Sequence, residues 1–311
     1  MPPAAEVIRI LLTALGCGLG AAVSAEVRLG SLAPLQLSGE ASAGFEYDSN
    51  VSVEEVDRSS NESDYAATLE AGVGARQPLP LNTTLQLTYD FSTSLYQTFS
   101  EVNRQTHILG SAFAWKTDVI DSDLSVYYIH SRLDGDRFLE LYRVSPALSG
   151  FLSRRWFARA AYVYQDKTVA ERTLRDATTN SGEFDLYFFA RGLRQYLNLG
   201  YRYKDEDAQA DQLDFRSDSF KLRYVQRIDA WSRLLKLELS WRYEDRDYLS
   251  DTPSIGEKRR DDRHRLGVDL EIPLGERSAV QVYFGHGDYA SNLKRVDYRQ
   301  NIAGTRLLYR W

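Results

Sequence analysis

Apolar and polar residues alternate along most of this chain with a period of two. From Leu35 to Tyr47 the odd positions are apolar or small, and most of the even positions are polar. The clearest run, from Leu235 to Tyr243, alternates large apolar residues with Lys, Glu, Ser and Arg. Such a pattern predicts strands with one apolar and one polar face. Alternation over a dozen residues is long for a soluble domain and typical of a tilted strand that crosses a membrane.

Repeats of this pattern predict about fourteen strands, joined as an up-and-down meander. The connections after even-numbered strands are short, and most of those after odd-numbered strands are longer and more charged. We expect the longest loop at residues 245–262 and a solvated loop at residues 48–63, which are rich in Ser, Asn, Asp and Glu. Pro146 lies inside a predicted strand over residues 138–152, where we expect a β-bulge.

The predicted strands must close into a ring, because lipid offers no hydrogen-bond partner to a free sheet edge. The first strand, near Leu35, should therefore pair with the last strand, which ends at Trp311. The predicted fold is all-β: a closed antiparallel transmembrane β-barrel over residues 35–311. An edge strand of a soluble sandwich is the alternative interpretation of the last strand.

The last strand also resembles the C-terminal signal that the barrel assembly machinery recognises in bacterial outer-membrane proteins. Leu307, Tyr309 and Trp311 share its apolar face, whereas Arg306 and Arg310 share the polar face. The resemblance implies the assembly machinery as a partner.

The N-terminal residues 1–25 have the features of a secretory signal peptide. Arg9 precedes an apolar run, and Val23-Ser24-Ala25 forms the small-x-small pattern of a cleavage site, so we expect cleavage after Ala25. Residues 26–34 would be a short periplasmic lead-in. Cys17 is an alternative lipidation site, but Ala14 stands three residues before it where a lipoprotein signal favours Leu. We expect the mature chain in the outer membrane of a Gram-negative bacterium.

Composition narrows the classes of partner. The net charge of −6 argues against a nucleic-acid partner, and the single Cys in the leader leaves no mature Cys for a disulfide or a metal. Tyr is abundant, with 20 residues. Aromatic side chains near both ends of the strands predict two girdles in contact with lipid and lipopolysaccharide. The tryptophans on the short-turn side are Trp115, Trp156, Trp231 and Trp311, and the tyrosines nearer the long loops are Tyr47, Tyr65, Tyr96, Tyr128, Tyr164, Tyr203, Tyr243 and Tyr298.

The polar faces of the strands predict a charged lumen. Acidic residues come from the first three strands and basic residues from later ones, so opposed acidic and basic arcs could orient polar solutes. Alternatively, the charges pair with one another and hydrate a plugged interior. A ring of this size suggests a narrow pore, which the loop 245–262 could constrict. The candidate lumen residues are Glu40, Glu46, Glu70, Asp90, Arg191, Arg202, Lys204, Lys221, Arg223, Lys236, Arg242, Arg306 and Arg310.

No pattern in the sequence predicts catalysis. The four histidines, His107, His130, His264 and His286, lack metal-ligand spacing and match no barrel-hydrolase pattern. We therefore expect neither an enzyme nor a cofactor or metal. Lys258-Arg259-Arg260 could contact lipopolysaccharide phosphates, although a solvated loop is the simpler interpretation.

The motif Tyr47-Asp48-Ser49-Asn50-Val51, with the strand count and the closing residues, resembles the barrels of the surface lipoprotein assembly modifier family. The resemblance covers the barrel and not the tetratricopeptide domain that precedes it in that family. It implies help in moving a lipoprotein to the cell surface. We keep three hypotheses: a narrow pore or export conduit for a polar substrate such as a lipoprotein or polysaccharide, a porin for small solutes, and a structural or adhesive barrel.

Overall fold

A computed structural model describes residues 33–311. The predicted signal peptide, Cys17 and most of the lead-in lie outside the described residues. Within the described part of the chain, no helix is long and apolar enough to cross a bilayer.

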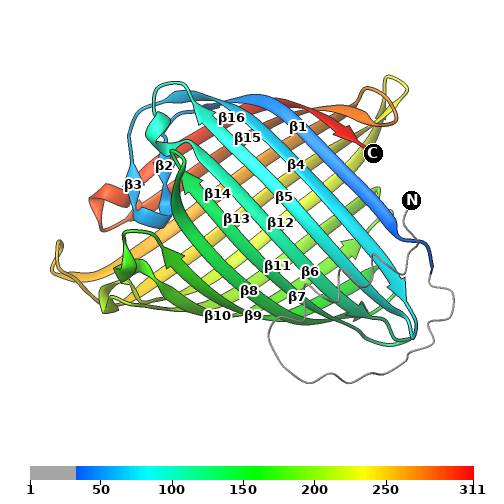
Figure 1. Cartoon of the computed structure of the whole chain (residues 1–311), viewed down its shortest axis with the longest axis horizontal. Helices are drawn as coiled ribbons and strands as arrows, with labels where there is room; N and C mark the ends of the chain where they lie inside the picture. The colour runs from blue at the N-terminus through cyan, green and yellow to red at the C-terminus, as the bar shows by residue number, and fades with distance from the viewer. Residues whose placement is uncertain (1–32) are drawn as a thin grey trace. The chain divides into compact units, whose positions relative to one another are not determined.

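Fourteen antiparallel strands form a closed barrel in sequence order, as predicted (Figure 1). Each strand pairs with the strands before and after it along the chain, so the topology is an up-and-down meander. The strands are β1 (Gln36–Asp48), β4 (Asp64–Leu79), β5 (Thr83–Tyr96), β6 (Arg104–Trp115), β7 (Asp121–Leu133), β8 (Asp136–Phe151), β9 (Trp156–Val169), β10 (Ala177–Phe189), β11 (Gln195–Ala208), β12 (Phe215–Ala230), β13 (Arg233–Thr252), β14 (Glu257–Pro273), β15 (Ser278–Ser291) and β16 (Tyr298–Arg310).

The ring closes where β1 pairs with β16, in a register that sets Phe45 opposite Thr305. At the end of this seam the Trp311 backbone N–H donates to the Gly39 carbonyl oxygen at 3.0 Å. The Trp311 indole lies over Gly39 so closely that a Cβ at this position would be 2.2 Å from the ring. A side chain at residue 39 would therefore displace the indole, and Trp311 packs directly on the first strand.

The alternation of the sequence separates a lipid face from a lumen face. Leu37 and Phe45 point outward and are more than 70% exposed, whereas Ser42 and Asp48 on the other face of β1 are buried. The tryptophans predicted for the short-turn girdle are all solvent-exposed on the isolated barrel. Two tyrosines depart from the prediction: Tyr96 and Tyr298 face the lumen, where their hydroxyls donate to Asp48 and Ser52.

The two ends of the barrel differ as predicted. The connections at one end are short, and bacterial barrels place such turns in the periplasm; they are residues 80–82, 116–120, 152–155, 190–194, 231–232 and 274–277. Most connections at the other end, here called the external end, contain a single 3-10 turn; these turns are η1 (Glu54–Val56), η2 (Ser100–Val102), η3 (Thr173–Arg175), η4 (Asp211–Leu213) and η5 (Lys294–Val296).

Two local predictions are wrong. Residues 245–262 are not a long loop, because β13 and β14 continue to Thr252 and from Glu257 and leave only residues 253–256 between them. Pro146 causes no bulge: it leaves a gap in the pairing of β8 with β9, but the register is the same on both sides of the gap. The register shift in β8 lies instead opposite Ser131 and Arg132 of β7.

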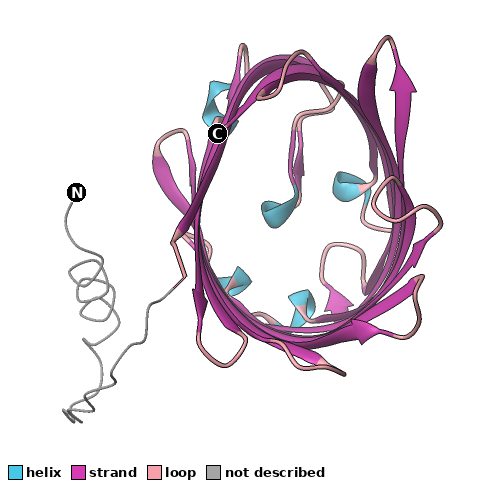
Figure 2. Ribbon diagram, turned by 90° about the vertical axis from the view of Figure 1, so that its right-hand side faces the viewer, coloured by secondary structure: helices cyan, strands magenta, loops and turns pink. Residues whose placement is uncertain are grey.

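The longest connection joins β1 to β4, and it folds into the barrel. Residues 49–63, here called the inserted hairpin, contain β2 (Ser52–Val53), the turn η1 and β3 (Arg58–Ser59). Figure 2 shows this two-stranded segment and its helical turn inside the ring of strands. The prediction of a solvated loop is therefore wrong for this segment, since Val51, Val53 and Val56 are buried.

Candidate functional site

The inserted hairpin leaves β1 through a turn formed by the motif Tyr47-Asp48-Ser49-Asn50-Val51. Asp48 is buried, and its carboxylate accepts hydrogen bonds from the Gln300 side chain at 2.9 and 3.0 Å and from the Asn50 backbone N–H at 2.9 Å. The Ser49 hydroxyl accepts a hydrogen bond from the Asn301 backbone N–H at 2.7 Å. These contacts attach the start of the hairpin to β16.

Asn50 holds the two arms of the hairpin together. Its side-chain oxygen accepts hydrogen bonds from the Ser59 hydroxyl at 2.7 Å and the Asn61 backbone N–H at 2.9 Å, and its amide nitrogen donates to the Arg299 carbonyl at 3.1 Å. The Val51 N–H donates to the Glu62 carbonyl at 3.1 Å. The motif that carried the family resemblance therefore turns the chain into the lumen. Tyr47 stays outside, beside Tyr65.

The tip of the hairpin docks on an apolar patch across the lumen. Val53 and Val56 form a buried cluster with Phe138 on β8 and Val169 on β9. These strands lie five and six places from β1 in a ring of fourteen, so the hairpin crosses nearly the whole lumen. Burial of each apolar side chain stabilises the docked hairpin by roughly 1.5–3 kcal/mol.

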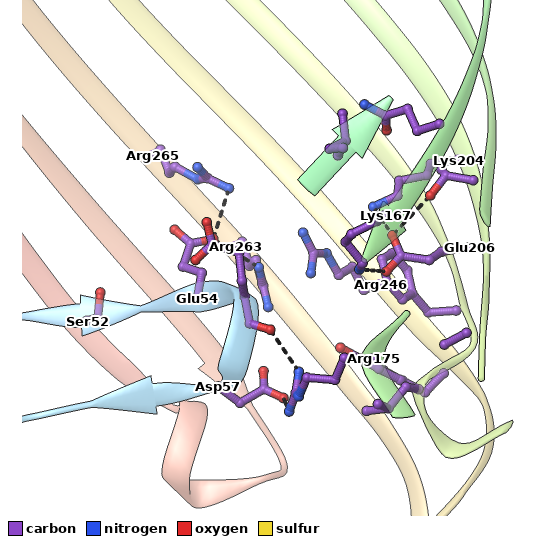
Figure 3. Close-up of a pocket in the computed structure, with 18 of the residues that line it drawn as sticks. Ser52, Glu54, Asp57, Lys167, Arg175, Lys204, Glu206, Arg246, Arg263 and Arg265 are labelled. Carbon is purple, nitrogen blue, oxygen red and sulfur yellow. Dashed lines mark hydrogen bonds and ion pairs between the residues drawn. The ribbon is translucent and has the colours of Figure 1, made fainter. Parts of the chain in front are cut away.

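Three carboxylates of the hairpin pair with arginines of the wall (Figure 3). Glu55 makes a bidentate pair with Arg104 of β6, at 2.8 and 3.1 Å. Glu54 lies 3.4 Å from Arg263 and 3.7 Å from Arg265, both on β14. Bidentate and charge-assisted contacts of this kind are the stronger class of hydrogen bond.

Asp57 makes the most buried of these contacts. Its carboxylate lies 2.6 Å from the Arg175 guanidinium of η3 and 3.1 Å from that of Arg259 on β14. Burial alone raises the pKa of the Asp57 carboxyl, but Arg259 and Arg175 outweigh burial and lower its pKa to about 2. The hairpin is thus bound to β6, to η3 and to β14, on three sides of the lumen.

A cavity of about 520 Å³ lies between the inserted hairpin and the wall formed by β9 to β14. Its far side is basic: Lys167 and Lys204 each lie 2.6 Å from Glu206, and Arg246 lies 2.8 Å from Glu244. The external half of the lumen is therefore charged, hydrated in character and internally paired.

The structure places twelve of the thirteen candidate lumen residues on the inward face of a strand, namely Glu40, Glu46, Glu70, Asp90, Arg202, Lys204, Lys221, Arg223, Lys236, Arg242, Arg306 and Arg310. Arg191 is the exception. It lies in the exposed turn after β10, because that strand ends two residues earlier than predicted.

The expected separation into an acidic and a basic arc is wrong. Carboxylates occur throughout the basic region, so most cations are paired with a neighbour: Lys221 with Asp185 at 2.7 Å, and Arg223 and Lys236 with Glu238. On the seam side Arg306 pairs with Glu70, and Arg310 pairs with Glu40 and Glu271. The period-two pattern of the sequence identifies which of these residues point inward. It does not reveal which inward residues of neighbouring strands form ion pairs with one another.

The arginines that bind the hairpin were missed as site residues. Arg259 belongs to the Lys258-Arg259-Arg260 segment for which lipopolysaccharide contact or a solvated loop was expected, yet its side chain is buried in the lumen and pairs with Asp57 and Asp261. Arg104, Arg263 and Arg265 lie on inward faces that alternation could have identified. Arg175 comes from a loop and carries no periodic signal.

Two of the histidines, His107 on β6 and His130 on β7, are opposite each other in the sheet, with ring centroids 6.3 Å apart. The His107 ring is 2.8 Å from the Tyr89 hydroxyl, and His130 is 3.5 Å from the Glu140 carboxylate. Among residues 33–311, no group of three or more His, Cys, Asp or Glu side chains could hold a metal ion. The expectation that the chain is not an enzyme stays a prediction.

Residues 40–272 match the family described as surface lipoprotein assembly modifier. The chain belongs to this family. The matched region contains the inserted hairpin and every wall arginine that binds it, so both are part of the surface lipoprotein assembly modifier barrel. A comparison with curated proteins finds no match.

Solved structures share the fold. The anion-selective porin from Comamonas acidovorans is 7% identical, with a TM-score of 0.53 over 89% of this chain and 99% of the porin. OmpT, an outer membrane protein of Vibrio cholerae, is 11% identical, with a TM-score of 0.51 over 89% of this chain and 97% of that protein. The family and the fold together identify this chain as an outer-membrane β-barrel.

Proposed function

We propose that this barrel is an export conduit, closed at rest by the inserted hairpin, that takes part in delivering a lipoprotein to the cell surface. The observation that carries the proposal is the position of the hairpin, which crosses the lumen and binds the wall on three sides. The family supports a lipoprotein as the substrate, and an exported polysaccharide is a further candidate of similar polarity.

The charged wall fits a polar passenger. Fourteen strands lie between barrels of about eight strands, which side chains fill, and porins of 16–18 strands, which hold an aqueous channel. Displacement of the hairpin would leave a lumen lined by paired charges, along which a polar, extended chain can exchange hydrogen bonds with water and wall. The barrel assembly machinery and lipopolysaccharide remain proposed partners for insertion and for the outer surface.

The test compares surface lipoproteins in cells that have or lack this chain. Surface proteins are labelled on intact cells with a membrane-impermeant biotin reagent, and the labelled and total lipoproteins are quantified by mass spectrometry. We expect at least one lipoprotein to be lost from the labelled fraction while its total amount is unchanged, and the wild-type gene to restore it. An unchanged set of labelled lipoproteins would contradict the lipoprotein role.

A porin for small solutes is the second candidate function, and the charged cavity of about 520 Å³ beside the hairpin favours it. Planar-bilayer recording of the full chain separates the two functions. A closed conduit gives no steady current at rest, whereas a porin conducts continuously. A structural or adhesive barrel would stay silent even when the contacts of the hairpin are removed.

A further inference from the structure

A second cavity, of about 350 Å³, lies lower in the lumen than the inserted hairpin, and we call it the waist cavity. Its charged lining residues lie near the middle of their strands. Four are cations and two are carboxylates: Arg143, Arg202, Lys221 and Arg242, with Glu183 and Asp185. The cavity therefore carries an excess of positive charge.

Like charges lie side by side in this part of the wall. In the register of the sheet Lys221 of β12 is opposite Arg242 of β13, and Arg242 is opposite Arg265 of β14. Like charges directly opposite each other destabilise a sheet. Lys221 and Arg265 have carboxylate partners that offset this cost, so the remaining cost falls on Arg242, and a counter-anion would relieve it.

The carboxylates of the waist cavity leave Arg242, the middle cation of this row, without an ion-pair partner among the described residues. Asp185 is used by Lys221 at 2.7 Å, and Glu183 is shared between Arg143 at 3.5 Å and Arg202 at 4.0 Å. Within residues 33–311, the Arg242 side chain makes no ion pair or hydrogen bond, whereas its neighbours Lys221 and Arg265 pair with carboxylates. The buried Nε of Arg143 also has no hydrogen-bond partner. Two guanidinium groups therefore retain donors that point to no protein acceptor.

We propose that the waist cavity is a binding site for a multivalent oxyanion, such as phosphate or carboxylate groups of a polyanionic ligand. Guanidinium groups present planar pairs of N–H donors that match the oxygens of phosphate and carboxylate. The volume is in the range of small-ligand sites, roughly 300–1,000 Å³. The low-dielectric walls of the barrel concentrate the positive potential inside the lumen. Arg242 is the central residue of the site, since it joins the row of cations to the cavity.

The proposal does not depend on the hairpin or on lipoprotein delivery. Loss of anion binding would leave the closed conduit intact, and a conducting wild-type barrel would leave the anion site intact. The two proposals therefore fail in different experiments.

The test is isothermal titration calorimetry of the full chain, folded in detergent, with tripolyphosphate as the probe. We expect saturable binding at one site. Arg242→Gln should weaken it about tenfold, the value of one charge-assisted contact. The control is Arg223→Gln, which removes the same charge from the same lumen but from an arginine that already pairs with Glu238; it should change the affinity less than about twofold.

Two arms identify the source of the anion. Tripolyphosphate represents free multivalent phosphate, and poly-glutamate represents an extended carboxylate chain; saturable binding of either supports the site. Absence of binding by both would overturn the proposal, and so would an equal loss in the Arg242→Gln and Arg223→Gln variants, because diffuse lumen charge would then explain the affinity. Heat-modifiability on gels checks folding. If Arg242→Gln does not fold, Arg242→Lys keeps the charge and should give an intermediate affinity.

Discussion

The two halves of the lumen differ in how the cations on the inner wall are neutralised. At the external end, arginines of β6, β14 and η3 are neutralised by three carboxylates that arrive on the inserted hairpin. At the waist, Arg242 lies between two paired cations and has no carboxylate partner among the described residues. Cations on the inner wall of a barrel can thus be neutralised by a segment outside the sheet that supplies carboxylates. Where no such segment is present, the cations stay available to bind an anion.

Arg265 belongs to both halves. It is opposite Arg242 in the sheet, and its guanidinium lies 3.7 Å from Glu54 of the hairpin and 3.8 Å from Glu244. Substitutions on either side of this residue therefore test whether the two halves behave independently.

Removal of the hairpin carboxylates should have the largest effect. The triple variant Glu54→Gln, Glu55→Gln, Asp57→Asn removes every ion pair between the hairpin and the arginines around it, at a cost of about 5 kcal/mol for one buried and two partly exposed contacts. We expect frequent opening in planar bilayers, and we expect the wild type to be silent under the same conditions. Glu62→Gln is the matched control, since Glu62 is exposed and its side chain makes no ion pair among the described residues. A silent triple variant would show that charge pairing does not seal the lumen.

The apolar contacts should contribute less. Val53→Ala with Val56→Ala removes two methyl groups at each position, which costs about 1.5 kcal/mol per residue and shifts the closed-to-open ratio roughly 100-fold. The measured quantity is the open probability in single-channel records. Val102→Ala, at the edge of the same cluster, should have a smaller effect. A greater effect of the valine pair than of the carboxylate triple would reverse the assigned order of the two contributions.

The waist should control the selectivity of an opened barrel. Arg242→Glu, made in the triple variant so that current flows, reverses the charge of the one row residue without an ion-pair partner in the described chain. We expect the reversal potential in a salt gradient to move from anion preference toward cation preference. Arg223→Glu in the same background should shift it less. Equal shifts would indicate that total lumen charge, and not the waist, determines selectivity.

Acidification should have the smallest effect near neutral pH. The docked state lowers the pKa of Asp57 from 3.8 to about 2, so its contribution to docking is complete above pH 3.8 and is lost as the pH falls through about 2. From this residue we expect no opening between about pH 8 and 5, and opening only in strong acid. Recording open probability against pH tests this, and Asp57→Asn should abolish the acid step. A wild-type step near neutral pH that persists in Asp57→Asn would assign the response to another group.

The fold and its faces could be predicted from the sequence for a definite physical reason. Each strand contacts lipid on one side and water on the other. The residue type at each position, such as Leu237 or Lys236, therefore indicates which face that side chain is on. The same parity correctly assigned Glu40 and Arg310 to the lumen. The prediction for Arg191 was wrong because the alternation between the two faces does not continue beyond the end of a strand.

The inserted hairpin could not be predicted in the same way. Its three valines stand among polar residues, and the partners of Val53 and Val56, which are Phe138 and Val169, are about 80 or more residues away in the sequence. The direction of a loop depends on such distant contacts, which leave no periodic signal. The first residues of β14 were also missed. Residues 257–262 are charged on both faces of the strand, which here extends beyond the apolar band.

The attachment of the hairpin to β16 has a consequence for the timing of biogenesis. Asp48, Ser49 and Asn50 bind Gln300, Asn301 and Arg299, which belong to β16, the strand that follows all the other described strands along the chain. Before that strand joins β1, the hairpin lacks the anchor that directs it inward. An incomplete barrel therefore remains unsealed, and a fluorophore at residue 56 would report, in real time, the moment at which each molecule is finished.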